Sequence, residues 1–373
     1  MKELELNAKG NLVSLLQLTL KDLKLYSGNI DGIFGQNTLT AVEQFQLENN
    51  LSVDGIVGKN TWNKLYKYIS VPTTIPYDSD ILNVNIASFL LKFPFIKVGY
   101  IGDTVMDKDI PYIKLGIGNK QLLYVASTHA NEWITTPVLM KFVEDYATNY
   151  TTNSTLYNIS IRELYTSYSI YVVPMLNIDG VDLVTNNLSK NSNYYLTAKQ
   201  ISLNYPNIRF PNGWKANIQG IDLNLQFPAQ WNNAKEIKYA QGFTSPAPRD
   251  FVGDYPLQAP EVVALYDFCI NNDFKLMLTY HSQGEVIFWK FQDFNPPNSQ
   301  LIGEEFAKLS GYSLESTPYT SSFAGFKDWF IQNYNLPGYT IEVGLGTNPL
   351  PISQFDKIYT DNLPILITSP TLI

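Results

Sequence analysis

The chain has 373 residues, of which 45% are hydrophobic and 16% charged, so disorder over its whole length is excluded and two domains fit. Its 26 lysines and arginines against 34 acidic residues give a formal charge of −8, the reverse of the basic excess typical of nucleic-acid-binding proteins. The single cysteine, Cys269, excludes an intrachain disulfide and a cysteine-built metal site, and any histidine-dependent chemistry has to use His129 or His281.

The N-terminal segment carries acidic residues where a secretory signal has an unbroken apolar run, so we expect no signal peptide. No stretch reaches the roughly 18 apolar residues that a membrane helix needs. We therefore expect a chain that is made in soluble form and has no membrane span.

Residues 29–38 and 52–61 form an internal repeat, and each copy is built around the pattern Asp-Gly-x-x-Gly. Asp-Gly predicts a turn, because glycine adopts a positive φ at little steric cost. Apolar residues follow each turn at helical spacing, with Asn37 and Asn60 as the expected N-cap residues, and a further apolar stripe precedes the first turn. We therefore predict that residues 1–69 form a small domain of three helices.

This segment resembles the peptidoglycan-binding domain found on many bacterial cell-wall hydrolases. The resemblance covers almost all of residues 1–69 and implies that the segment binds peptidoglycan. The alternative is a generic helical module whose glycines only shape turns. The matching residues are Leu16-Gln17, Gly28, Asp31–Gly35, Thr38, Ala41-Val42, Phe45-Gln46, Val53–Gly58 and Trp62.

Residues 70–78 contain Pro72 and Pro76, which disfavour helix and predict a short semi-extended linker. The remaining residues, 79–373, form the second predicted domain. Buried-strand patterns alternate there with helix-like segments, which favours an α/β fold with a mixed sheet flanked by helices. The expected strands include 121–126, 169–174 and 274–280, and the expected helices include 133–148 and 258–271.

A candidate metal site follows the first of these strands, where His129 and Glu132 stand three residues apart at the entry of an expected helix. This spacing lets an imidazole and a carboxylate share one face and converge on one ion. His281 directly follows another expected strand. Two histidines and one carboxylate leave a fourth tetrahedral position open, which is typical of catalytic rather than structural zinc. The alternative for each histidine is a hydrogen-bonded polar residue at a strand end.

A ligating imidazole normally donates its other N–H to a carboxylate or a carbonyl group. Asp222, in the stretch Gly220–Asn224, is a candidate for this role. The alternative is an aspartate that only stabilises a turn, and the residues alone do not decide between the two.

Residues 85–345 carry a wider pattern that resembles the zinc carboxypeptidase superfamily, of the carboxypeptidase A type. The resemblance implies an α/β sheet fold with one Zn²⁺ held by His129, Glu132 and His281. It also implies that Glu342 is the general base, whereas alone this residue would be interpreted as an ion-pair partner at a strand end. The matching motifs are His129-x-x-Glu132, Pro174–Gly180, Trp214-Lys215, Gly220–Asn224, His281-Ser282, Gly325–Trp329 and Thr340–Glu342.

The chain departs from the family's pattern at the clamp for the substrate's terminal carboxylate. The family's carboxypeptidases usually have an asparagine followed by an arginine there, whereas Asn224 is followed by Leu225. The fork geometry of a guanidinium is therefore lost at this position. Lys215 replaces the family's oxyanion arginine, and we expect it to stabilise developing charge as a point cation.

Three further side chains are predicted to contact the substrate. Arg249 is expected to meet a substrate carboxylate, and the alternative is a loop salt bridge with Asp250 or Asp254. Tyr319 matches the family's mobile active-site tyrosine, and the alternative is an ordinary core tyrosine. Ser282 is part of the second histidine motif and is expected at the same site.

A wall-binding domain joined to this peptidase domain resembles the bacterial γ-D-glutamyl-meso-diaminopimelate peptidases. The resemblance implies a zinc metallopeptidase that cuts the γ-D-glutamyl amide to diaminopimelate in peptidoglycan stem peptides. Two alternatives stay open: a carboxypeptidase acting on ordinary peptides, and a non-catalytic peptidoglycan-binding protein. The expected partners are peptidoglycan and its stem peptides, with no nucleic acid. We expect the chain in the cytoplasm or the mother cell, acting on cell-wall or spore peptidoglycan.

Overall fold

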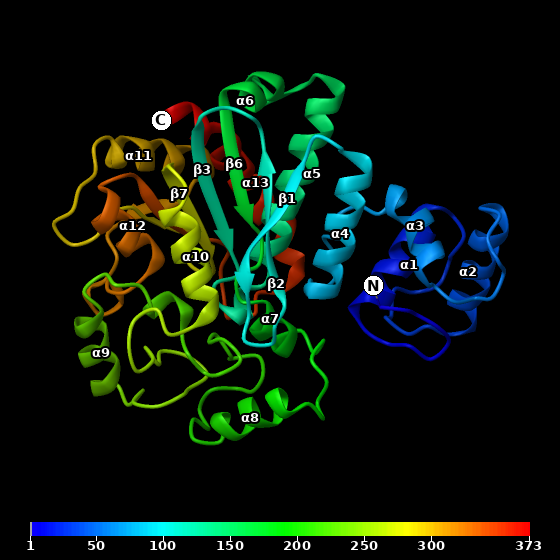
Figure 1. Cartoon of the computed structure of the whole chain (residues 1–373), viewed down its shortest axis with the longest axis horizontal. Helices are drawn as coiled ribbons and strands as arrows, with labels where there is room; N and C mark the ends of the chain where they lie inside the picture. The colour runs from blue at the N-terminus through cyan, green and yellow to red at the C-terminus, as the bar shows by residue number, and fades with distance from the viewer. Residues whose placement is uncertain (1) are drawn as a thin grey trace.

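The computed structural model describes residues 2–373, in which a small helical part lies beside a larger α/β part (Figure 1). The small part contains the three helices expected from the sequence, followed by one short 3₁₀ helix. These are α1 (Asn11–Asp22), α2 (Gln36–Glu48), α3 (Lys59–Leu65) and η1 (Tyr66–Tyr68).

The internal repeat is organised by a buried glutamine that precedes each turn. Gln17 Oε1 accepts hydrogen bonds from the backbone N–H groups of Asp31 (3.1 Å) and Gly32 (3.0 Å), while its Nε2 lies 2.8 Å from Asp31 Oδ1. Gln46 makes the same contacts with Asp54 and Gly55, at 3.1, 2.9 and 2.8 Å. Each Asp-Gly-x-x-Gly turn is therefore held by a side chain from the preceding helix, which explains why the repeat includes residues outside the turn itself.

The helices that follow these turns begin two residues earlier than an asparagine cap requires, so the prediction of Asn37 and Asn60 as N-caps is wrong. The N-cap residues are Gly35 and Gly58. Both have an extended backbone, and no side chain caps either helix by a hydrogen bond. Their carbonyl groups accept the first helical hydrogen bonds, at 3.0 Å in each helix. The extended glycine that closes each turn therefore also starts the helix.

Replacing Gln46 by leucine should destabilise the N-terminal part by about 1–3 kcal/mol, because the buried backbone N–H of Gly55 and the partly buried N–H of Asp54 lose their acceptor. Hydrogen exchange read by mass spectrometry on peptides from residues 2–68 measures this locally. The control is Gln44→Leu, on the exposed face of the same helix. Equal exchange protection in the two variants would contradict the role given to Gln46.

The segment that joins the two parts is packed rather than free. Ile75 and Tyr77 are buried at 7% and 0% exposure. Asp78 is the N-cap of α4 (Ser79–Lys92), and its other carboxylate oxygen accepts a hydrogen bond of 2.9 Å from Asn11 of the small part. The predicted semi-extended linker therefore also fixes the small part against the large one.

An eight-stranded mixed sheet forms the centre of the large part. Its strands are β1 (Lys97–Asp103), β2 (Asp109–Leu115), β3 (Lys120–Ala126), β6 (Tyr168–Val173), β7 (Phe274–His281), β8 (Val286–Phe288), β9 (Ser313–Glu315) and β10 (Gly338–Glu342). The order across the sheet is β1-β2-β6-β3-β7-β10-β8-β9. The neighbours β6, β3, β7 and β10 are parallel, so their carboxyl ends lie at one edge of the sheet. A separate ribbon pairs β4 (Thr155–Leu156) with β5 (Ile159–Ser160).

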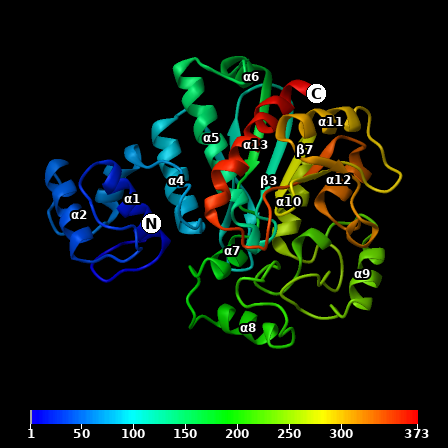
Figure 2. The ribbon, with the colours of Figure 1, turned by 180° about the vertical axis from the view of Figure 1, so that it is seen from behind.

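Helices cover both faces of this sheet, as the predicted α/β architecture requires. The helices α5 (Thr135–Thr152) and α13 (Phe355–Thr368) pack together on the face that is turned to the viewer in Figure 2, and α10 (Pro260–Ile270) and α12 (Phe326–Tyr334) lie on the other face. The remaining helices of these layers and loops are α6 (Ile161–Ser167), α7 (Ile178–Val184), α8 (Asn193–Ser202), α9 (Trp231–Ala240), α11 (Ser299–Ser310), η2 (Ala130–Glu132), η3 (Leu223–Leu225), η4 (Tyr319–Ser321), η5 (Ile352–Gln354) and η6 (Ser369–Leu372).

The strands expected at 121–126, 169–174 and 274–280 correspond to β3, β6 and β7, with ends that agree within one residue. The helix expected at 133–148 begins later, at Thr135, because Trp133 and Ile134 form a turn that links η2 to the helix. Among the helices of residues 2–373, none combines the length and the apolar run that a membrane crossing requires.

Candidate metal centre

The candidate ligands lie at the edge where the parallel strands end. His129 follows β3 and leads directly into η2, which carries Glu132. His281 is the last residue of β7, and it stands opposite Glu342, the last residue of β10, in the parallel register. The strand order therefore brings these four residues together, although the first and the last of them are more than 200 positions apart in the sequence.

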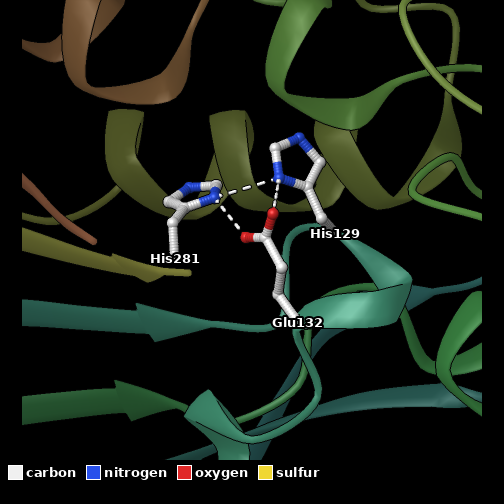
Figure 3. Close-up of side chains that lie close together, drawn as sticks. All are labelled: His129, Glu132 and His281. Carbon is white, nitrogen blue, oxygen red and sulfur yellow. Dashed lines mark hydrogen bonds and ion pairs between the residues drawn. The ribbon is translucent and has the colours of Figure 1, made fainter. Parts of the chain in front are cut away.

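Three of these side chains converge on a single point (Figure 3). The Nδ1 atoms of His129 and His281 are 3.1 Å apart, and the two oxygens of Glu132 lie 3.1 Å from the first and 2.9 Å from the second. All three side chains are buried, with exposures of 8% or less. Two imidazole nitrogens and a carboxylate are a donor set that zinc prefers, and the cluster suits one ion.

The outer nitrogens of both rings have their own partners. His129 Nε2 lies 3.1 Å from Asp222 Oδ1, and His281 Nε2 lies 3.3 Å from Thr279 Oγ1. When each Nε2–H donates to its partner, both Nδ1 lone pairs face each other across 3.1 Å. Two facing lone pairs repel, and either a proton on one Nδ1 or a metal cation bound between them removes the repulsion. The residues present therefore fit a bound zinc ion.

Charges around the cluster keep Glu132 ionised. Burial alone would raise the pKa of Glu132, but Lys215 and His129 hold it well below its usual range. Burial and Lys215 lower the pKa of His129, but the carboxylates of Glu132 and Asp222 outweigh them and raise it to about 9. Burial lowers the pKa of His281. The centre is therefore an anionic carboxylate between two imidazoles that differ in basicity.

Lys215 and Glu342 border the cluster. Lys215 Nζ lies 2.9 Å from Glu132 Oε1, and its charge is maintained because that carboxylate raises its pKa against the effect of burial. Burial, together with the negative charge of Glu132, raises the pKa of Glu342 to about 8. A carboxyl group that exchanges a proton near neutral pH is suited to general acid–base work.

A buried asparagine holds the loops that carry these groups. Asn177 Nδ2 lies 3.2 Å from the carbonyl oxygen of Thr128, 3.3 Å from that of Lys215 and 3.0 Å from that of Ala216. Its own backbone N–H donates to the carbonyl of Ser127. The motif 174–180 of the sequence therefore supports the ligand loop and the lysine loop and does not itself enter the site.

Two hollows meet at the cluster. The first, here called the inner pocket, has a volume of about 290 Å³ and lies between η3, α12 and β10. The second, here called the outer trough, has a volume of about 910 Å³. Both are bordered by Lys215, Arg249, Phe288 and Glu342, so a substrate can extend from one into the other past the reacting centre.

The structure brings most of the other predicted site residues to these hollows. Asn224 and Leu225 line the inner pocket, and the side-chain oxygen of Asn224 accepts a hydrogen bond of 3.0 Å from the N-terminus of α12. Ser282 lines the outer trough, and its backbone N–H lies 3.2 Å from Glu132 Oε2. Arg249 borders both hollows and also pairs through Nε with Asp250 at 2.5 Å.

Tyr319 is the exception among the predicted substrate contacts. Its side chain is 65% exposed, and its ring packs edge-on against Phe323. The neighbours Thr317, Pro318 and Ser321 line the inner pocket, whereas Tyr319 is not among its lining residues. The structure therefore does not bring Tyr319 to the site, and its role stays a prediction.

The sequence did not single out a buried ion pair in the inner pocket. Lys327 Nζ lies 2.7 Å from Asp328 Oδ1, and the two side chains are only 5% and 4% exposed. Asn348 is a second omission, because its Nδ2 lies 3.5 Å from Glu132 Oε1 and 2.7 Å from the carbonyl oxygen of Ser282. The only sequence signal for the pair of Lys327 and Asp328 was its place inside the motif 325–329.

Comparison with known families fits this geometry. The sequence profile described as "Zinc carboxypeptidase" matches residues 86–365, which is more than half of the chain. The chain belongs to the zinc carboxypeptidase family. The profile described as "Putative peptidoglycan binding domain" matches residues 9–65. The two matches fall inside the predicted domains 79–373 and 1–69, whose exact boundaries stay predictions.

Two bacterial relatives share most of their length with this zinc carboxypeptidase. It is 44% identical to Gamma-D-glutamyl-L-diamino acid endopeptidase 1 of Lysinibacillus sphaericus, over 78% of this chain and 71% of the relative. It is 39% identical to the uncharacterized protein YqgT of Bacillus subtilis, over 78% of this chain and 76% of that one. The predictions of a zinc metallopeptidase and of a zinc cofactor are confirmed.

Solved structures confirm the fold. Carboxypeptidase A from Helicoverpa armigera superposes with a TM-score of 0.60 at 16% identity, and covers 98% of this chain and 95% of its own. Thrombin activatable fibrinolysis inhibitor gives a TM-score of 0.63 at 17% identity, over 88% of this chain and 79% of that one. The predicted mixed sheet flanked by helices is therefore the carboxypeptidase fold.

Replacing Asp222 by asparagine should weaken zinc binding about 10- to 100-fold, because the carboxylate orients the His129 ring and raises its basicity. Competition with a chromophoric chelator measures the affinity. The matched control is Asp273→Asn, at a surface carboxylate that pairs with Lys275. Zinc affinity unchanged by Asp222→Asn would contradict the orienting role of this residue.

Proposed function

We propose that this protein is a zinc peptidase that hydrolyses the γ-D-glutamyl amide bond to a diamino acid in peptidoglycan stem peptides. The observation that carries the proposal is the inner pocket, where a buried ion pair replaces the terminal-carboxylate clamp of ordinary carboxypeptidases. His129, Glu132 and His281 supply the metal site, and Glu342 stands beside them at the same sheet edge.

The relatives support the same substrate. The relative from Lysinibacillus sphaericus is named for cleavage at γ-D-glutamyl-L-diamino acid bonds, and 44% identity over 291 residues favours a shared activity. A stretch of 58 residues of this chain is 43% identical to a Spore cortex-lytic enzyme of Oceanobacillus iheyensis, and the match covers 21% of that enzyme. Together with the peptidoglycan-binding profile, this similarity favours cell-wall or spore peptidoglycan as the place of action.

The reaction needs a proton carrier and a cation near the scissile carbonyl. A zinc ion held by His129, Glu132 and His281 supplies Lewis-acid chemistry at this centre. Glu342 accepts a proton from the attacking water as the new C–O bond forms, and it returns that proton to the nitrogen as the C–N bond breaks. Lys215, at the border of both hollows, places a positive charge where negative charge develops on the carbonyl oxygen.

The inner pocket fits the side chain of diaminopimelate, which ends in an ammonium and a carboxylate on one carbon. Lys327 Nζ donates to the carbonyl oxygen of Lys290 at 2.7 Å and has further N–H donors for a carboxylate. Asp328 Oδ1 lies 2.7 Å from Lys327 Nζ, and a carboxylate oxygen keeps a further lone pair that can accept a hydrogen bond from an ammonium. The pair therefore complements both ends of a zwitterion, whereas Leu225 offers no donor to a terminal carboxylate.

Arg249 fits the second charge of this substrate. A D-glutamate joined through its γ-carboxyl group keeps a free α-carboxylate close to the scissile bond. Arg249 stands at the junction of the inner pocket and the outer trough, and Asp250 engages its Nε, which leaves the terminal N–H groups of the guanidinium for a bidentate contact.

Replacing Glu342 by glutamine should lower kcat about 10²- to 10⁴-fold while zinc remains bound, because an amide cannot carry the proton. The measurement is release of L-alanyl-D-glutamate from a purified stem tripeptide that contains diaminopimelate. An ordinary peptide, run in parallel, should give no free C-terminal amino acid. Turnover in Glu342→Gln within a few-fold of the native enzyme would remove this residue from the mechanism, and efficient cleavage of the ordinary peptide would favour a general carboxypeptidase.

Replacing Lys327 by methionine should reduce the preference for diaminopimelate over lysine in the stem peptide by about tenfold or more, because lysine lacks the distal carboxylate that Lys327 binds. The ratio of the two kcat/KM values measures the preference. Lys308→Met, at a lysine with 76% side-chain exposure, is the control. An unchanged ratio in Lys327→Met would show that Lys327 does not bind the distal carboxylate of diaminopimelate.

A further inference from the structure

The outer trough is the larger of the two hollows, and its walls differ in character from those of the inner pocket. With about 910 Å³ against about 290 Å³, it has room for the longer half of the substrate. Its lining is rich in carboxamide side chains, which donate and accept hydrogen bonds without carrying charge. These are Asn131, Asn207, Asn212, Gln283 and Asn348.

The charges of the outer trough are almost all positive. Among the described residues that line it, Lys215, Arg209 and Arg249 are cations, and Glu342 is the one acid. Glu342 is already committed to the proton transfer at the scissile bond. A substrate that ends in the free ammonium of L-alanine would therefore place its charge among cations and amides, without a carboxylate to pair with. A neutral, acylated alanine meets no such penalty.

The far end of the outer trough leads toward the N-terminal part. A further hollow shares Asn212 and Pro349 with it, and this hollow is also bordered by Trp133 and by Pro76 of the linker. The path therefore runs from the metal centre toward the segment that joins the two parts of the chain.

The N-terminal part is held at the end of this path. Ser88 of α4 donates to the carbonyl oxygen of Tyr66 at 2.7 Å, Lys2 pairs with Asp80 at 3.2 Å, and Asn11 bonds to Asp78. Figure 1 shows α1 to α3 seated beside α4. A glycan strand bound by this part therefore lies at a fixed distance from the metal centre.

We propose that the outer trough binds the acyl half of a stem peptide whose alanine nitrogen is still acylated by the muramic acid of the glycan. The inference rests on the proposed function and adds the form of the substrate to it. The enzyme then cleaves stem peptides that are attached to glycan strands, in preference to peptides already released from them. The carboxamides receive the neutral lactyl and N-acetyl groups, and no carboxylate is required at that end.

Two soluble substrates test the proposal: N-acetylmuramoyl-L-alanyl-γ-D-glutamyl-diaminopimelate and the same tripeptide with a free alanine amino group. At about pH 6.5 that amino group is protonated, and kcat/KM should favour the acylated substrate by about tenfold. A ratio of one or less overturns the inference and leaves the proposed function standing. Cleavage of neither substrate overturns the proposed function and the inference with it.

The variant Asn212→Asp adds a carboxylate to the outer trough with almost no change of shape. It should lower the ratio of acylated to free substrate several-fold by attracting the free ammonium. Asn232→Asp, on the exposed side of α9, is the matched control and should leave the ratio unchanged. If Asn212→Asp also leaves it unchanged, the trough does not hold the alanine end of the substrate and the inference fails.

Discussion

The catalytic part of this molecule depends on two imidazole nitrogens that face each other across 3.1 Å. Such a contact is unfavourable for two neutral rings with their lone pairs aligned, and it persists because the outer nitrogens are bound to Asp222 and Thr279. The β3 and β7 strands fix the positions of both rings, and Glu132 closes the third side. The fold therefore maintains a site whose repulsion a single cation relieves.

One buried carboxylate connects this centre to the substrate hollows. Asp222 accepts from the His129 ring through Oδ1 and from the backbone N–H of Asp250 through Oδ2, at 3.0 Å. Asp250 in turn pairs with Lys238 and Arg249. The orientation of a metal ligand and the position of the arginine between the two hollows are therefore connected through one buried carboxylate.

The sequence predicted the parts of this site that lie within short motifs. His129 and Glu132 share a helix entry, and His281 and Glu342 end apolar strands, so spacing and family resemblance found all four. The walls of the two hollows were harder to predict from the sequence, because they consist of distant segments that only the sheet order brings together. Lys327 and Asp328 lie within the motif 325–329, but only the structure shows that they form a buried ion pair. The N-cap assignments failed because extended glycines precede those helices.

The claim that both histidines bind through Nδ1 is tested most directly by diffraction from zinc-loaded crystals at the zinc absorption edge. The account predicts one anomalous peak in this cluster, about 2.0–2.2 Å from both Nδ1 atoms and from an oxygen of Glu132, with His129 Nε2 still bound to Asp222. A zinc ion on either Nε2 atom, or no peak between the two rings, would contradict it.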